Sequence, residues 1–222
     1  MLTGIRGGRR RVTAARRDAG FSVVELSVAM VISSLLLALV VAALISMVRS
    51  YQKVQDTTLA DDRGRVILDR LDRDLRQAAA VNLPQTVGGS AYVEYETDVA
   101  APGAAPTCTQ WRLDGGAHVL AVRTWTLPAP TAAPAWTPIA TGVVNDLTTE
   151  PPFAVAAAGS IPGVTVQREQ LAVHLRLSLA HGQALTQAAI TARNSSAASG
   201  AAADADGDGV PDTPVCLTFG RS

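Results

Sequence analysis

The hydrophobic and polar positions divide the chain into an apolar run, an amphipathic stretch and a region of strand-like alternation. The apolar run, from Leu26 to Val48, contains no charged residue. Because a helix rises about 1.5 Å per residue, a run of this length spans the roughly 30 Å of hydrocarbon in a bilayer. It exceeds the apolar core of a cleaved secretory signal and lacks a small-residue cleavage site after it. We therefore predict a transmembrane helix.

The stretch after the apolar run has apolar residues at helical spacing. They recur three and four positions apart between residues 67 and 79 and form one stripe. The predicted solvated face carries acid-before-base pairs four residues apart, namely Asp61 with Arg65, Asp69 with Arg73 and Asp72 with Arg76. Pro84 and Gly88-Gly89 interrupt the pattern, so we predict one helix from about Phe21 to about Val81.

The rest of the chain shows period-two alternation in short segments bounded by glycine and proline. The predicted strands are Ala91–Glu96, Thr109–Leu113, Ala117–Thr126, Leu171–Leu179 and Ala188–Ala192. Asp114-Gly115-Gly116 predicts a hairpin turn between the second and third strands. The expected fold class is therefore α+β, with a long amino-terminal helix packed on an antiparallel sheet.

Charge is balanced over the whole chain but not along it. There are 19 basic and 19 acidic residues, and six of the basic ones precede Phe21 beside a single acid, Asp18. The positive-inside rule therefore places the amino terminus in the cytoplasm and everything after the span outside. The remainder, from Phe21 onward, is net acidic, which argues against direct nucleic-acid binding.

Glu25 is an acid at the cytoplasmic edge of the apolar run, where an unpaired charge costs several kcal/mol. The segment Gly20-Phe21-Ser22-Val23-Val24-Glu25-Leu26, between an arginine-rich leader and the span, resembles the signal of type IV prepilins. The alternative is a plain signal-anchor with an incidental glutamate.

The resemblance implies that prepilin peptidase cuts between Gly20 and Phe21 and that the new amine of Phe21 is methylated. It also implies that Glu25 meets the amine of a neighbouring subunit during assembly. A carboxylate and an ammonium in a medium of low dielectric relieve each other's desolvation, so the pairing is physically reasonable.

The pilin-like architecture that the resemblance implies has four parts. They are a basic leader at 1–20, a transmembrane helix at 21–48, its amphipathic continuation at 49–82 and a β-rich extracytoplasmic head at 83–222. Degenerate patterns at 65–78, 111–123 and 190–194 favour a J-class minor pseudopilin or a related pilus-assembly minor pilin. The same patterns also have ordinary structural explanations.

The head contains an acidic loop and two cysteines. Calcium prefers oxygen ligands at alternate loop positions, which Asp204, Asp206, Asp208, the Val210 carbonyl and Asp212 would supply, with a weak Kd of about 10⁻⁴ to 10⁻³ M. The alternative is an acidic, glycine-rich disordered tail. Cys108 and Cys216 both fall outside the membrane, which favours a disulfide over two reduced cysteines.

The sequence contains no nucleophile elbow, phosphate-binding loop or zinc-protease motif, so we expect no enzymatic activity. We predict a minor pilin or pseudopilin subunit of a type IV pilus or type II secretion pseudopilus, in initiation or at the tip. The expected partners are prepilin peptidase, other pilin or pseudopilin subunits, an inner-membrane assembly platform and membrane lipid. The alternative is a membrane-anchored, calcium-dependent extracellular binding module.

Overall fold

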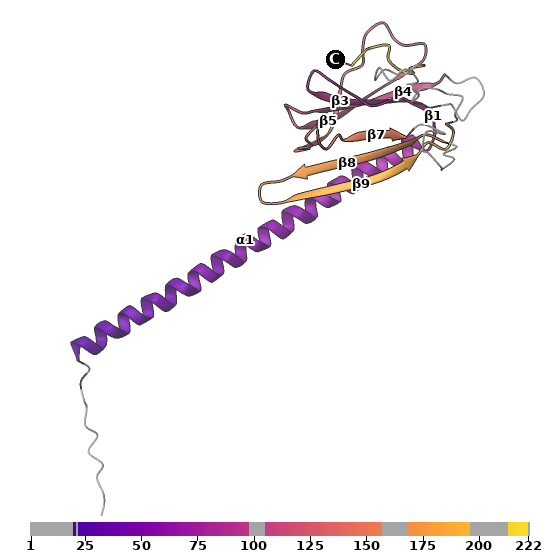
Figure 1. Cartoon of the computed structure of the whole chain (residues 1–222). Coiled ribbons are helices and arrows are strands. Elements are labelled where there is room, and N and C mark those ends of the chain that lie inside the picture. Colours follow the sequence, from indigo (N-terminus) through magenta and orange to yellow (C-terminus); the bar gives the residue numbers. More distant parts are fainter. Residues whose placement is uncertain (1–19, 21, 98–104, 157–167, 196–212, 222) are drawn as a thin grey trace, which may run out of the picture. The chain divides into compact units, whose positions relative to one another are not determined.

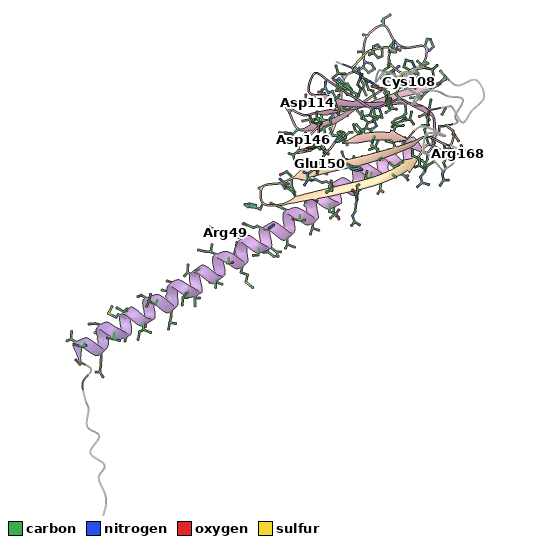
Figure 2. All side chains as sticks on the ribbon, viewed as in Figure 1. Arg49, Cys108, Asp114, Asp146, Glu150 and Arg168 are labelled. Carbon is green, nitrogen blue, oxygen red and sulfur yellow. A yellow bond between two sulfur atoms is a disulfide. The ribbon has the colours of Figure 1, made fainter. Side chains whose placement is uncertain are left out.

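The computed structural model describes Gly20 and residues 22–97, 105–156, 168–195 and 213–221. One long helix is followed by a six-stranded and a three-stranded sheet (Figure 1). The chain divides into two compact units, Met1–Val48 and Arg49–Ser222. Arg49, on the helix, is therefore the first residue of the second unit (Figure 2). The predicted α+β class is confirmed.

The helix α1 extends over Val23–Leu75, 53 residues. All its side chains in the first unit are exposed, and an 18-residue window of α1 with mean hydropathy 2.9 is 0% buried. A helix this long and apolar meets the length and composition required to cross a membrane.

The helix ends at Leu75, so the predicted extension to about Val81, and with it the helical segment 49–82, was too long. Ala78–Val81 instead forms strand β1, which pairs antiparallel with β3 (Ser90–Thr97). Alanine has a high helix propensity, but three of the four β1 residues are buried in this pairing. Tertiary packing therefore overrides the local preference.

The six-stranded sheet is antiparallel in the order β1-β3-β4-β5-β6, and β2 also pairs with β3. Its further strands are β2 (Gln85–Val87), β4 (Thr107–Asp114), β5 (Val119–Thr126) and β6 (Thr137–Thr141). The three predicted strands between 91 and 126 correspond to β3, β4 and β5, with the predicted turn between the last two. β1, β2 and β6 were not predicted, because they are short and lack period-two alternation.

The smaller sheet has the order β7-β8-β9, from Phe153–Ala156, Gln170–Ser178 and Gln183–Thr191. The alternation predicted for the β8 segment is confirmed, since Leu171, Val173, Leu175 and Leu177 are all buried. Val143 forms a bridge with Leu177, so the chain leaving β6 also pairs with β8. This segment connects the two sheets.

The second half of α1 packs on the head through the stripe Ala60, Gly64, Ile67, Leu71 and Leu75. Ala60, Ile67, Leu71 and Leu75 share one hydrophobic core with side chains from both sheets. The six-stranded sheet reaches the helix through the Tyr95 hydroxyl, which donates to Asp74 Oδ2 at 3.5 Å. The hairpin between β8 and β9 reaches it through the His181 backbone N–H, which donates to Asp56 Oδ2 at 2.8 Å.

Candidate processing and assembly site

The start of α1 has the geometry of a capping box. The backbone N–H of Ser22 donates to Glu25 Oε2 at 3.1 Å, and the N–H of Val24 donates to Ser22 Oγ at 3.3 Å. In a capping box the two side chains satisfy backbone donors that the first helical turn leaves unpaired. Ser22 and Glu25 therefore fix where the helix begins.

The Glu25 carboxylate thus has a partner within its own chain, in addition to the intersubunit partner that the sequence suggested. It lies at the amino-terminal end of the helix, where the helix dipole stabilises a negative charge. The role of Ser22 was missed because the segment was interpreted by its charge alone. The Ser-x-x-Glu spacing before an apolar run is the signal that would have revealed it.

The predicted cleavage position lies just before this cap. Gly20 is exposed and not helical, and a Cβ added to it would meet nothing within 4 Å. Phe21 lies outside the described residues. An exposed, non-helical residue before a capped helix is compatible with access by a peptidase, and cleavage at this bond stays a prediction.

Two serines within the apolar part of α1 donate hydrogen bonds to the helix backbone. Ser27 Oγ donates to the Val23 carbonyl at 2.7 Å, and Ser34 Oγ donates to the Val31 carbonyl at 2.8 Å. Since a hydroxyl in hydrocarbon needs a partner, these bonds make both serines compatible with a membrane.

In the head, the predicted disulfide between Cys108 and Cys216 is present, with 5.4 Å between the two Cα atoms. Cys108 belongs to β4 and is labelled in Figure 2. The candidate calcium ligands Asp204, Asp206, Asp208, Val210 and Asp212 lie outside the described residues. Within the part of the chain that is described, no group of three or more His, Cys, Asp or Glu side chains is placed to hold a metal.

Two acidic groups between the helix and the large sheet have raised pKa values. Burial raises the pKa of the Asp74 carboxyl, although Arg70 and the hydrogen bond from Tyr95 act in the opposite direction. Burial also raises the pKa of the Tyr95 phenol, and the nearby Asp74 charge adds to the effect. Both groups belong to packing between α1 and β3 and lie away from the helix start.

Residues 15–41 match a family model described as the prokaryotic N-terminal methylation motif. No curated protein and no solved structure matches the chain. The matched segment contains Gly20, Ser22 and Glu25 and continues into the exposed apolar part of α1. A prepilin methylation motif at the capped start of a long apolar helix, followed by antiparallel sheets, supports a type IV pilin-like protein.

Proposed function

We propose that this protein is a minor pilin or pseudopilin subunit that assembles through α1 into a type IV pilus or a type II secretion pseudopilus, in initiation or at the tip. The methylation motif carries the proposal, because the matched residues 15–41 include Glu25 and the start of an exposed apolar helix. In this proposal prepilin peptidase removes residues 1–20 and methylates Phe21.

Before assembly the apolar half of α1 is held in the cytoplasmic membrane, with the head outside. The disulfide supports this orientation, because disulfides persist in oxidising extracytoplasmic compartments. Lipid tails are as apolar as leucine, so helix association in a membrane depends on packing and on polar contacts. A carboxylate that pairs with a neighbour's amine would therefore contribute specificity to assembly.

Three single variants separate the charge of Glu25 from its capping role. Glu25→Gln keeps an oxygen that accepts from the Ser22 N–H but removes the charge. Glu25→Ala removes both functions, and Ser22→Ala removes the cap acceptor for Val24 while leaving the charge. Each variant is expressed with the assembly machinery of the source cell, and its amount is measured in sheared fibres and in membranes.

We expect Glu25→Gln and Glu25→Ala to reduce incorporation into fibres by roughly tenfold or more, because an uncharged side chain forms no ion pair with an ammonium. Ser22→Ala should stay within about twofold of the wild type, since removing a helix cap costs only about 1 kcal/mol. Normal incorporation of Glu25→Gln would show that assembly does not need the charge of Glu25 and would contradict the proposal.

A further inference from the structure

The carboxy-terminal segment 213–221 lies against one face of the six-stranded sheet (Figure 1). Successive side chains of a strand point to opposite faces. Tyr95, Trp111 and Val122 belong to the core shared with α1, whereas Glu94, Gln110 and Arg123 point to the other face. The segment therefore covers the face turned away from the helix.

On that face, three polar side chains form a row across the central strands. Glu94, Gln110 and Arg123 are direct neighbours in the register of β3, β4 and β5. Gln110 Nε2 donates to Glu94 Oε1 at 2.8 Å, and Arg123 Nε donates to Gln110 Oε1 at 2.6 Å. Glu94 and Gln110 are fully buried, so the row is desolvated beneath the terminal segment.

The row binds the backbone of the terminal segment. Gln110 Nε2 and Arg123 Nη2 both donate to the Gly220 carbonyl, each at 3.0 Å. The Arg123 guanidinium also lies 5.7 Å from the Phe219 ring centroid and 4.4 Å from that of Trp136. The segment is thus held through its main chain as well as through its side chains.

Arg221 occupies a site built from four acceptor contacts. Its Nε donates to Glu94 Oε1 at 3.0 Å and its Nη2 to Glu94 Oε2 at 2.6 Å. Its Nη1 donates to Gln85 Oε1 at 2.7 Å, and its Nη2 also donates to the Leu83 carbonyl at 2.8 Å. A two-point contact between guanidinium and carboxylate with both side chains buried is strong and directional.

At the other end of the segment, Asn82 binds the residue next to the disulfide. The Val215 N–H donates to Asn82 Oδ1 at 2.8 Å, and Asn82 Nδ2 donates to the Val215 carbonyl. Cys216 follows with φ of 58°, a left-handed conformation that residues with a side chain rarely adopt. Cys216 is therefore flanked by contacts on both sides, with Asn82 before it and the polar row after it.

We propose that residues 213–221 form a strap whose non-covalent contacts, above all the Arg221–Glu94 ion pair, hold Cys216 beside Cys108 and thereby favour closure of the disulfide. In this scheme Arg221 is a positioning residue for oxidation. The inference concerns the maturation of the head and does not depend on the proposed role in a fibre.

The closing reaction needs a disulfide as oxidant, which an oxidising compartment supplies. With glutathione disulfide, one cysteine thiolate attacks a glutathione sulfur, forms a mixed disulfide and releases one glutathione thiolate. The second cysteine thiolate then attacks the protein sulfur of the mixed disulfide, forms the Cys108–Cys216 bond and releases the second glutathione. The protein loses two electrons and two protons, which the two glutathione thiols carry.

The test measures the effective concentration of the two thiols in the full-length protein in detergent. Because the chain has only two cysteines, the oxidised fraction in glutathione redox buffers reports this one disulfide. Docking and oxidation are linked, so a contact that favours docking of the strap in the reduced protein raises the effective concentration. Circular dichroism establishes that each variant is folded in both redox states.

We expect Arg221→Ala to lower the effective concentration about a hundredfold, because removing one partner of a buried ion pair leaves the other charge unpaired. The matched control is Arg176→Ala, which removes a two-point ion pair with Glu150 elsewhere in the head. That control should lower the stability of the head only slightly, because the Arg176–Glu150 pair is partly exposed. Its effective concentration should stay within about twofold of the wild-type value.

Arg221→Lys keeps the charge but loses the two-point contact, so its effective concentration should lie between those of the wild type and Arg221→Ala. An Arg221→Ala protein that folds and has the wild-type effective concentration would overturn the proposal. If the alanine variant does not fold, a lysine variant equal to the wild type overturns it instead.

Discussion

The carboxylate of Glu25 accepts a hydrogen bond from Ser22 within its own chain. In the proposed assembly, a neighbouring amine therefore has to be a more favourable partner for the Glu25 carboxylate than this bond together with the helix dipole. Assembly on this account is an exchange of partners for Glu25. The exchange explains why the glutamine variant is more informative than the alanine variant.

Asp74 is a second residue whose surroundings determine its effect, in this case on the stability of the fold. Its carboxyl has a raised pKa in the fold, so the protonated form favours folding and the ionised form opposes it. The stabilisation that the protonated carboxyl contributes is fully present below the pKa of the unfolded state, near 3.8. It is lost as the pH rises through the raised pKa of the folded state. At neutral pH the ionised carboxyl therefore lowers the free energy of unfolding.

We predict that Asp74→Asn raises the free energy of unfolding of the head at pH 7 by a few tenths of a kcal/mol, a small gain because the carboxyl is partly exposed. The gain should disappear as the pH falls below about 4. Urea unfolding of both proteins across this pH range measures it. A variant that is less stable than the wild type at pH 7 would show that the Tyr95 hydrogen bond outweighs the burial of the charge.

At the scale of elements, helix and strand pack closely where Gly64 of α1 meets Thr186 of β9. A Cβ at position 64 would overlap Thr186 Oγ1 and lie 2.7 Å from Thr186 Cβ. The hairpin that follows β8 approaches similarly, since a Cβ at Gly182 would lie 2.7 Å from the Thr57 backbone nitrogen. Glycine at these two positions permits the helix and the small sheet to touch.

We predict that Gly64→Ala destabilises the head by about 1 to 2 kcal/mol, because overpacking exceeds the gain in helix propensity. Thr186→Ala removes the Oγ1 and Cγ2 contacts, so the double variant should be more stable than the sum of the single effects predicts. Gly116→Ala is the control, since its nearest neighbour would be 3.6 Å away. Equal thermal stability of Gly64→Ala and the wild type would contradict this packing account.

The elements predicted from the sequence were those in which apolar residues recur with a clear period. The apolar run, the alternation in β8 and the predicted stripe as far as Leu75 each continue over several residues, and the structure confirms them. The end of α1 and strand β1 were missed because Ala78 and Ala79 continue the helical spacing of the apolar stripe, whereas Ala78–Val81 becomes a strand by pairing with β3. Strand β6 was hidden by Pro138, which is unusual within a strand.

For the candidate site, the sequence identified Glu25 and the two cysteines, because each has a spacing or context that carries chemistry. The sequence did not indicate that Ser22 caps the helix at this site. It also did not indicate the polar row of Glu94, Gln110 and Arg123 beneath the strap, or the ion pair between Arg221 and Glu94. The two residues of that ion pair are far apart in the chain, and only the register of β3 and the course of the terminal segment bring them together.

On the scale of the whole molecule, the acidic loop 204–212 remains a predicted calcium site. If its Kd is about 10⁻⁴ to 10⁻³ M, adding about 10 mM calcium should stabilise the head by about 1.4 to 2.7 kcal/mol through binding to the folded state. Thermal unfolding with calcium and with a chelator measures this effect. Replacing Asp206 and Asp208 with asparagine should remove the response, and identical melting temperatures for the wild type in both conditions would exclude a site of this affinity.

The proposed role of this protein in a fibre depends on processing of its amino terminus as in a type IV prepilin. Intact-protein and peptide mass spectrometry of the chain purified from membranes of its source cell tests this most directly. We predict a mature chain that begins at Phe21 and carries one methyl group on its α-amine. A mature protein that retains residues 1–20 would contradict the account.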